Sequence, residues 1–433
     1  MAKNMTNEIV VERLSNDALI VSKDMPFLRT ITFGMGVNVG AANETPGNSG
    51  ISHLIEHSVF KGTKNFSGRD LKRVIESVGG VLNAFTSREY TLFYAKVPDF
   101  ASRQAFDVLY ELVSAPTFPE KEIELEKGVV LEEIAMYEDD PADLSGTNLL
   151  KALWGEETPY GRPIIGKAET VKDITIGDIK KYFKEHYVSS NIVLSIVGNL
   201  KSCDMSYIKE KMGALRDGKS EGKIAKPVAL PPRNVLIEKR DLKQVNVSIG
   251  IKTVEKSDKR SYPLAIITTI LGGGMSSVLF ERLREKYGLV YSISSSNQSN
   301  KLGGYFTVDF STSPNRVFEA IKKIKKVLSD MVDTSSLKKH MDYGKKRLKG
   351  KLLTSTESTF STMFMMIDDQ FTLRKVREID TVIRSIESVR YNDVAETFKD
   401  FFLGKWTLSA VGPPGTVLNE LKAYEFEVNG DGH

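Results

Sequence analysis

The chain has 433 residues, more than one hydrophobic core normally serves, so two or more domains are expected. Hydrophobic residues make up 41% of it and charged residues 27%, which excludes a disordered chain. Its 60 Lys and Arg against 56 Asp and Glu leave a net charge of +4, without a dense basic run, so nucleic acid is not an expected partner.

The compartment is predicted from cysteine usage and from apolar runs. A single cysteine, Cys203, excludes an intrachain disulfide and is typical of a reducing compartment. The first 17 residues hold no apolar core of signal-peptide length, and the longest apolar run, around 264–271, is too short to cross a bilayer. These features predict a cytoplasmic protein that has no membrane partner.

The first chemical motif is SHLIEH, residues 52–57, on a segment with helical periodicity. His53 and His57 stand four residues apart, so their imidazoles lie on one helix face, one turn apart. Their neighbours Leu54 and Ile55 are apolar, which predicts a buried helix, where a shared zinc ion keeps both imidazoles neutral. Glu56 lies on roughly the same face and could reach a water held at the metal. The pattern is the inverted zinc-protease motif H-x-x-E-H; the alternative is a pair of core histidines bonded to backbone carbonyls.

A catalytic zinc needs a third protein ligand, and the other three histidines have no supporting motif. The acidic helix expected over about 119–139 offers carboxylates instead. At about 100° per residue, Glu126 and Glu133 fall beside its apolar stripe, whereas Glu132 lies roughly opposite. Glu133 and Glu126 are therefore candidates for a ligand and for a partner that orients an imidazole, with a salt bridge to Lys or Arg as the alternative. The stripe consists of Ile123, Val130, Ile134 and Tyr137.

Further along, residues 165–187 carry a long helical pattern, and a linker rich in Gly, Lys and Pro is expected over 213–234. The linker begins with GALRDGKS, residues 213–220, which satisfies the phosphate-loop pattern G-x-x-x-x-G-K-[ST]. That motif needs a strand before the loop and a helix after it. Here a polar helix precedes it and a Pro-rich stretch follows, so no nucleotide is expected.

The two sides of the linker are similar to each other. The strand–helix pattern from Tyr94 recurs from Tyr305, and NIVLSIVGNL near the end of the first half recurs as KWTLSAVGPP near the end of the second. This repetition predicts an α+β fold of two homologous domains, 1–212 and 235–433, each a mostly antiparallel sheet backed by helices. The second copy has YPLAIITTILGGG in place of the histidine helix, so only the first is expected to hold metal.

HLIEHSVFKGT, followed by Glu133 in VVLEEIAMYED, resembles the pitrilysin/insulinase family of zinc metallopeptidases, in particular the short-chain branch that includes the β subunit of mitochondrial processing peptidase. The resemblance covers nearly the whole chain. It implies one Zn²⁺ per chain on His53, His57 and Glu133, with Glu56 as general base and Glu126 as the supporting acid.

Two further segments extend the resemblance. GGVLNAFTSREYTLFYAKV, residues 79–97, resembles the family's active-site edge strand, so Asn83 and Ala84 would offer backbone groups to an extended peptide. LGGGMSSVLFERLREKYGLVYSI resembles the family's carbonyl-binding element, with Arg284 and Tyr291 as its pair. A guanidinium and a phenol directed at one point would stabilise the oxyanion of amide hydrolysis.

The family resemblance implies a zinc metalloendopeptidase that hydrolyses unfolded peptides or small proteins inside a closed chamber. A chain with two domains would form that chamber as a homodimer, with the zinc ligands of one subunit facing Arg284 and Tyr291 of the other. A heterodimer with a histidine-free homologue is an alternative assembly. The alternative functions are a non-catalytic scaffold or partner subunit of the same fold, and a zinc hydrolase that acts on substrates other than peptides.

Overall fold

A computed structural model describes residues 8–220, 224–226, 230–239, 241–331 and 334–429. It divides into two compact units, each assembled from segments that are not contiguous in sequence. Unit 1 comprises Met1–Ile134, Arg162–Ala225 and Thr354–Glu378, and unit 2 comprises Ala135–Gly161, Lys226–Leu353 and Ile379–His433. No helix among the described residues is both long enough and apolar enough to span a membrane.

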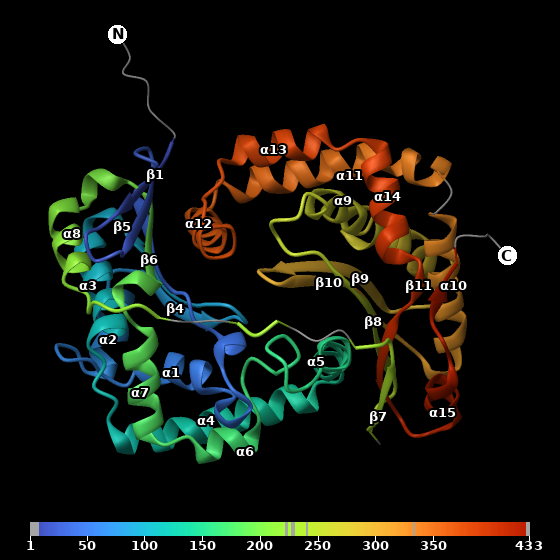
Figure 1. Cartoon of the computed structure of the whole chain (residues 1–433), viewed down its shortest axis with the longest axis horizontal. Helices are drawn as coiled ribbons and strands as arrows, with labels where there is room; N and C mark the ends of the chain where they lie inside the picture. The colour runs from blue at the N-terminus through green and yellow to red at the C-terminus, as the bar shows by residue number, and fades with distance from the viewer. Residues whose placement is uncertain (1–7, 221–223, 227–229, 240, 332–333, 430–433) are drawn as a thin grey trace, which may run out of the picture. The chain divides into compact units, whose positions relative to one another are not determined.

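Unit 1 is built on a six-stranded sheet in the order β1-β2-β6-β3-β5-β4, which leaves β4 as an edge strand (Figure 1). β2 and β6 pair in parallel, and the other neighbours are antiparallel. The strands are β1 (Ile9–Arg13), β2 (Leu19–Asp24), β3 (Thr30–Val37), β4 (Val81–Thr86), β5 (Thr91–Pro98) and β6 (Ile192–Gly198).

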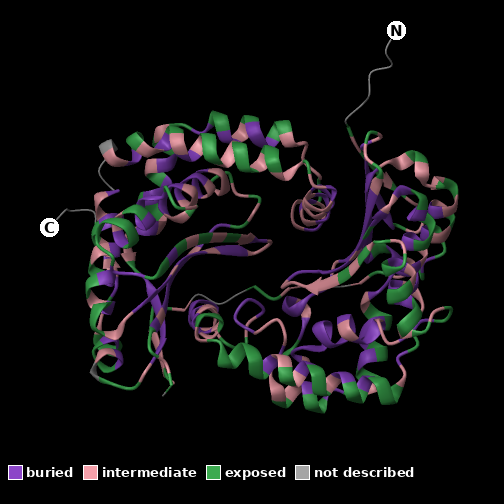
Figure 2. Cartoon of the chain, turned by 180° about the vertical axis from the view of Figure 1, so that it is seen from behind, coloured by how far each residue is buried: buried purple, intermediate pink, exposed green. Residues whose placement is uncertain are grey.

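One face of this sheet carries helices that close the main core of unit 1. The ring centroids of Phe33 on β3 and Phe106 on α3 lie 6.2 Å apart, and both side chains are fully buried, each contributing roughly 1.5–3 kcal/mol of hydrophobic stabilisation. Figure 2 shows the strands largely buried and the outer helix faces exposed. The helices up to residue 213 are α1 (Ile51–Val59), α2 (Gly68–Glu76), α3 (Ser102–Ser114), α4 (Glu120–Asp139), α5 (Pro141–Trp154), α6 (Ala168–Asp173), α7 (Ile176–His186) and α8 (Met205–Gly213).

Unit 2 repeats this topology with a sheet in the order β7-β12-β8-β10-β9, in which only β7 and β12 are parallel. Position by position, β7, β12, β8, β10 and β9 correspond to β2, β6, β3, β5 and β4. The strands are β7 (Asn234–Glu238), β8 (Val245–Thr253), β9 (Ser292–Asn300), β10 (Gly303–Thr312) and β12 (Thr407–Gly412), with the short pair β11 (Gly404–Lys405) and β13 (Glu427–Val428). The helices after β8 are α9 (Ser261–Gly272), the π-helix Phe280–Lys286, α10 (Val317–Asp330), α11 (Thr334–Ser355), α12 (Thr359–Leu373), α13 (Ile379–Ser388), α14 (Tyr391–Phe402) and α15 (Thr416–Ala423), of which α12 belongs to unit 1.

The second face of each sheet is covered by a helix from the other half of the sequence. α12 packs on β3 and β6 in unit 1, and α5 packs on β8 and β12 in unit 2. Glycines make room for both helices: a Cβ at Gly36 would lie 2.7 Å from the ring of Phe371, and one at Gly250 would lie 2.9 Å from Leu149. The compact units therefore differ from the contiguous division 1–212, 213–234 and 235–433, because each half contributes one helix to the other unit's core.

Other sequence predictions can be compared with these elements. The α+β fold with two similar, mostly antiparallel sheets is confirmed, and so is the acidic helix, now α4. The single helix over 165–187 is wrong: it is α6 and α7, because the Thr175 hydroxyl accepts the Asp178 N–H and starts a new helix. Tyr137 was placed in the apolar stripe of α4 but is 39% exposed.

The segment 213–220 begins with the last residue of helix α8, and residues 214–220 form neither a helix nor a strand. A helix rather than a strand therefore precedes this segment, and the residues described after it, 224–226 and 230–233, lie in no helix. The described residues from Ala214 to Arg233 contain no helix or strand.

Candidate metal centre

Helix α1 places the histidine motif inside unit 1. Ile51, Leu54, Ile55 and Val59 are buried in its core, which fixes the helix rotation. The backbone of Gly50, just before the helix, has φ +96°, a conformation that favours glycine, and a Cβ there would lie 2.8 Å from the Ile165 carbonyl oxygen. The core contacts and this turn together direct the histidine-bearing face of α1 toward α4.

Three side chains converge at this face. The ligand atoms of His53, His57 and Glu133 all lie within 4.8 Å of one another, the sole such group among the described residues. Glu133 Oε2 lies 3.7 Å from His53 Nε2 and 3.5 Å from His57 Nε2. Ligands bound at 2.0–2.2 Å to a tetrahedral zinc ion are about 3.3–3.6 Å apart. The Glu133 carboxylate therefore stands at nearly the separation from each imidazole that one shared zinc ion requires.

Glu126 and Lys61 hold His57 in a defined orientation. Glu126 is 8% exposed, and its Oε1 lies 2.9 Å from His57 Nδ1, while its other oxygen forms an ion pair with Lys61. A carboxylate at Nδ1 favours the tautomer with the proton there, which leaves the Nε2 lone pair for a metal. Glu126 thus makes both contacts considered for it from the sequence: it bonds an imidazole, and it forms a salt bridge with a lysine.

The charge state of His53 also suits a metal ligand. Burial, with a smaller contribution from His57, lowers the pKa of His53 to about 3. The imidazole is therefore neutral near pH 7, the state in which it can bind a cation. Its Nδ1 is buried and has no hydrogen-bond partner among the described residues.

Glu56 is buried beside the three ligand residues without being one of them. Its charge interacts with those of His57 and Glu133, so the carboxylate lies close to the candidate metal position. Burial raises its pKa above the ordinary value, whereas a hydrogen bond of 2.6 Å from the Thr86 hydroxyl to Oε2 acts in the opposite direction. A carboxylate with a raised pKa can both accept and return a proton near neutral pH.

Strand β4 runs past Glu56 as an edge strand. The Ser87 N–H donates to the Tyr90 carbonyl at 2.8 Å and closes the β4–β5 hairpin. Bonded pairs alternate along an antiparallel ladder, so the backbone groups of Asn83 face β5 and those of Ala84 face the free edge. The Asn83 side chain instead accepts the Ala84 N–H at 2.8 Å. Of the two residues expected to bind a peptide through the backbone, only Ala84 has its backbone groups at the free edge.

Sequence reasoning missed Thr86 and Lys61. Thr86 lies two residues after Ala84, the spacing that puts both side chains on one face of a strand, and this alternation was the available signal. Lys61 lies four residues after His57, but α1 ends at Val59, so helical spacing does not place it. Its contact with Glu126 depends on how α4 packs beside α1.

The N-terminus of α1 rests on a buried glutamate. The Glu44 carboxylate accepts the Gly50 N–H at 2.8 Å and the Ser52 N–H at 2.9 Å. Burial raises the pKa of Glu44 from 4.5 to about 7, although these bonds and Arg162 oppose the rise. Between pH 4.5 and 7 the folded state then binds a proton that the unfolded state has released.

This proton makes stability depend on pH. Because the folded-state pKa is raised, Glu44 contributes stability in acid that is lost as the pH rises through 7. From pH 5 to 8, metal-free wild type is expected to lose about 2–3 kcal/mol of unfolding free energy relative to Glu44→Gln. Denaturant unfolding of both proteins at each pH measures this difference, and other titrating groups cancel. A difference independent of pH would contradict it.

Arg284 and Tyr291 belong to unit 2. Arg284 is exposed near the end of the π-helix, with its guanidinium 4.8 Å from the centroid of the Phe280 ring. Tyr291 is 72% exposed immediately before β9, and Gly288 with φ +58° separates the two, as expected of a helix end followed by a strand. Both side chains are accessible, and their shared role remains a prediction.

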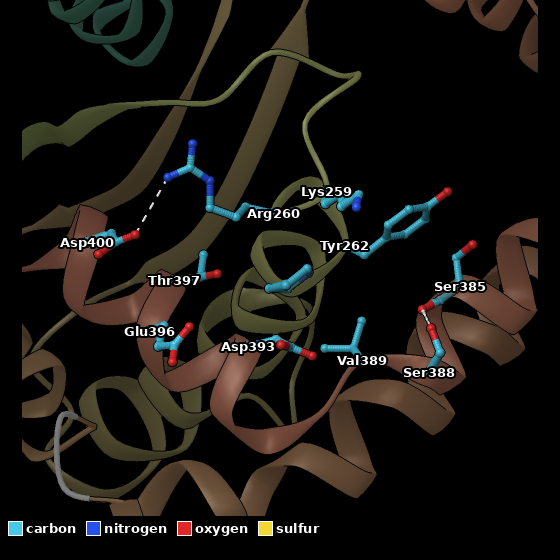
Figure 3. Close-up of a pocket in the computed structure, with 11 residues that line it drawn as sticks. Lys259, Arg260, Tyr262, Ser385, Ser388, Val389, Asp393, Glu396, Thr397 and Asp400 are labelled. Atoms are coloured by element: carbon cyan, nitrogen blue, oxygen red, sulfur yellow. Dashed lines mark hydrogen bonds and ion pairs between the residues drawn. The ribbon is translucent and has the colours of Figure 1, made fainter.

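A separate pocket of about 400 Å³ also lies in unit 2, between the N-terminal end of α9 and helices α13 and α14 (Figure 3). Arg260, one of the residues that line it, forms ion pairs with Asp258 at 2.7 Å and with Asp400 at 3.5 Å. None of the residues predicted to form the active site lines it.

Two family models match successive parts of the chain. Residues 19–168 match the family model described as "Insulinase (Peptidase family M16)", and residues 173–348 match "Peptidase M16 inactive domain". The chain is 33% identical to the uncharacterized zinc protease YmxG of Bacillus subtilis (strain 168), covering 93% of this chain and 98% of that protein. It is 30% identical to the uncharacterized zinc protease SCO5738 of Streptomyces coelicolor, covering 91% and 87%.

Solved structures show the same fold. A protease from Helicobacter pylori superposes with a TM-score of 0.86 at 23% identity, covering 94% of this chain and 100% of that one. A structure titled as the peptidase M16 inactive domain from Pseudomonas fluorescens gives 0.85 at 19% identity, covering 94% and 99%. Since its relatives are matched over nearly their whole length and its two family models follow one another along the sequence, the chain belongs to the insulinase family of peptidases, M16.

Proposed function

We propose that the chain is a zinc-dependent endopeptidase that hydrolyses unfolded peptides or small proteins. The observation that carries this proposal is the cluster of His53, His57 and Glu133 ligand atoms within 4.8 Å, with the buried carboxylate of Glu56 beside it. The names of the curated relatives, which call them zinc proteases, support it. The match to an inactive domain covers 173–348, which contains none of these four residues.

The residues of the site divide the chemistry between them. His53, His57 and Glu133 would hold one Zn²⁺ ion, and Glu126 would keep the His57 ring oriented through Nδ1. When bound, zinc would supply a Lewis acid that polarises the attacking water and the scissile carbonyl. Glu56 would accept the proton of the water and then return it to the leaving amine. No serine or cysteine nucleophile is required for this sequence of proton transfers.

Substrate binding is proposed to use the free edge of β4. An extended peptide that adds to an edge strand bonds through its main chain, so many sequences can be accepted. Ala84 presents its backbone groups at this edge, and the Asn83 amide group covers the Ala84 N–H until a peptide replaces it. This mode of binding favours unfolded chains, because a folded substrate has few backbone groups free to form hydrogen bonds.

The remaining parts of the proposal concern assembly. Arg284 and Tyr291 would stabilise the oxyanion from a second subunit, in a homodimer whose active sites are composite. Resemblance to the processing-peptidase branch and a cytoplasmic location are proposed on the sequence arguments given above. The alternative, a non-catalytic scaffold or partner subunit, predicts a protein that binds zinc and cleaves nothing.

Cleavage of an internally quenched peptide by the purified protein tests the proposal. Cleavage is expected to stop when a chelator removes the metal and to return when zinc is added, with magnesium as the ineffective control, because imidazole ligands prefer zinc. Metal content measured at each step connects activity with occupancy. Zinc binding without cleavage of any peptide in a broad panel would favour the scaffold alternative, and absence of zinc binding would refute the proposed site.

A further inference from the structure

Thr86 occupies two parts of the candidate site at once. It is the last residue of β4, the edge strand, and it also contacts Glu56 on helix α1. Its hydroxyl donates to Glu56 Oε2 at 2.6 Å, and its backbone amide interacts with the same carboxylate. A side chain of the edge strand therefore holds a buried carboxylate that lies 30 residues earlier in the chain.

The register of the hairpin explains why the Thr86 amide is available. Hydrogen-bonded and non-bonded residue pairs alternate along the β4–β5 ladder, and the Ser87–Tyr90 bond shows that Ser87 belongs to a bonded pair. The residue just before Ser87, and every second residue before that one, therefore has its backbone groups at the free edge. At two of these positions the amide is directed away from β5: the Ala84 N–H bonds the Asn83 side chain, and the Thr86 amide turns to Glu56. The free-edge positions are Leu82, Ala84 and Thr86.

We propose that Thr86 is a positioning residue that joins the peptide-binding edge to the general base. Along the free edge, Leu82 and Ala84 can pair with an added peptide, whereas the Thr86 amide is engaged by Glu56. A peptide paired as far as Ala84 thus brings its next peptide group to the Glu56 carboxylate. This inference rests on the proposed function and adds a determinant of where the scissile bond lies.

The expected effect of losing this contact follows from geometry. Glu56 must stand within hydrogen-bond reach of the attacking water, and small misplacements of a catalytic group cost on the order of 100-fold in rate. The Thr86 hydroxyl is a charge-assisted donor to a buried carboxylate, so no solvent molecule replaces it readily. Ala84 and the metal ligands do not depend on the hydroxyl, so peptide affinity and zinc content should be retained.

Four variants test the proposal by steady-state cleavage of one quenched peptide. Thr86→Val removes the hydroxyl at nearly constant shape, and Thr86→Ala repeats the removal without filling the space. Thr86→Ser keeps the hydroxyl and removes only the methyl group. Thr91→Val is the matched control, because Thr91 pairs with Thr86 across the hairpin but its hydroxyl donates to the Val39 carbonyl at 2.9 Å. Zinc content and the rise of melting temperature on adding zinc are recorded for each.

Thr86→Val and Thr86→Ala are expected to lower kcat roughly 10- to 100-fold while KM changes less than about twofold. Thr86→Ser and Thr91→Val should stay within about threefold of wild type, and all four should bind zinc as wild type does. Wild-type kcat in both Thr86→Val and Thr86→Ala, an equal loss in Thr86→Ser or Thr91→Val, or a rise in KM alone would overturn the inference. An inactive wild type would instead refute the proposed function itself.

Discussion

Glu56→Gln is expected to lower kcat by roughly 100- to 10,000-fold while leaving one zinc ion per chain. Glutamine keeps the shape of the side chain but cannot accept the proton of the attacking water, and general-base catalysis contributes roughly 100- to 10,000-fold. Zinc should remain because the ion is predicted to bind His53, His57 and Glu133, none of which is altered. Cleavage rate and metal content, measured on the same preparation, check both parts.

The control for this variant is Glu132→Gln, which removes a carboxylate from the exposed side of α4. It should cleave at the wild-type rate. If Glu56→Gln were as active as wild type, another group would have to act as the base. If it lost zinc along with activity, Glu56 would belong among the ligands and the proposed division of roles would be wrong.

Glu133→Gln is expected to weaken zinc binding more than 100-fold. An amide oxygen is a poorer ligand than a carboxylate, and losing even an outer partner of a metal site typically costs about 10- to 100-fold in affinity. Wild type should melt at a higher temperature when zinc is added, because zinc binds only the folded state, and the variant should show little of this shift. Thermal unfolding with and without zinc measures this effect without reference to activity.

The matched control is again Glu132→Gln, the adjacent residue on the same helix. Its zinc-dependent shift should equal that of wild type. A full shift in Glu133→Gln would mean that the third ligand lies elsewhere, with Glu56 and Glu126 as the buried carboxylates that remain beside the histidines. A loss in both variants would point to damage of α4 rather than to removal of a ligand.

The sequence predicted that His53, His57 and Glu133 cluster, because their placement follows helical periodicity. The four-residue spacing of His53 and His57 and the position of Glu133 beside an apolar stripe are properties of single helices, and they survive whatever those helices pack against. Buried Glu126 and exposed Glu132 on α4 agree with the same calculation. The exposed side chain of Tyr137 does not agree with it, because residues 135–139 at the end of α4 are all exposed.

The backbone orientation of the residues on the edge strand β4 does not follow from the sequence. The family resemblance of 79–97 predicted an edge strand, but whether Asn83 or Ala84 directs its backbone outward depends on the phase of the ladder. That phase is set by the Ser87–Tyr90 bond in the turn, which the residue types alone do not specify. The family resemblance named both residues, and only the paired structure separates them.

By itself, the sequence determined that two similar α+β halves follow one another and that only the first carries H-x-x-E-H with a glutamate on a later helix. Tertiary structure alone decided that Lys61 supports Glu126, that Thr86 holds Glu56, and that α5 and α12 are exchanged between the two units. Periodicity is a short-range property that each segment encodes locally. Contacts between segments far apart in the chain depend on which surfaces pack together. The need for glycine at Gly36 and Gly250 can be recognised only when the helix that packs against each of them is in place.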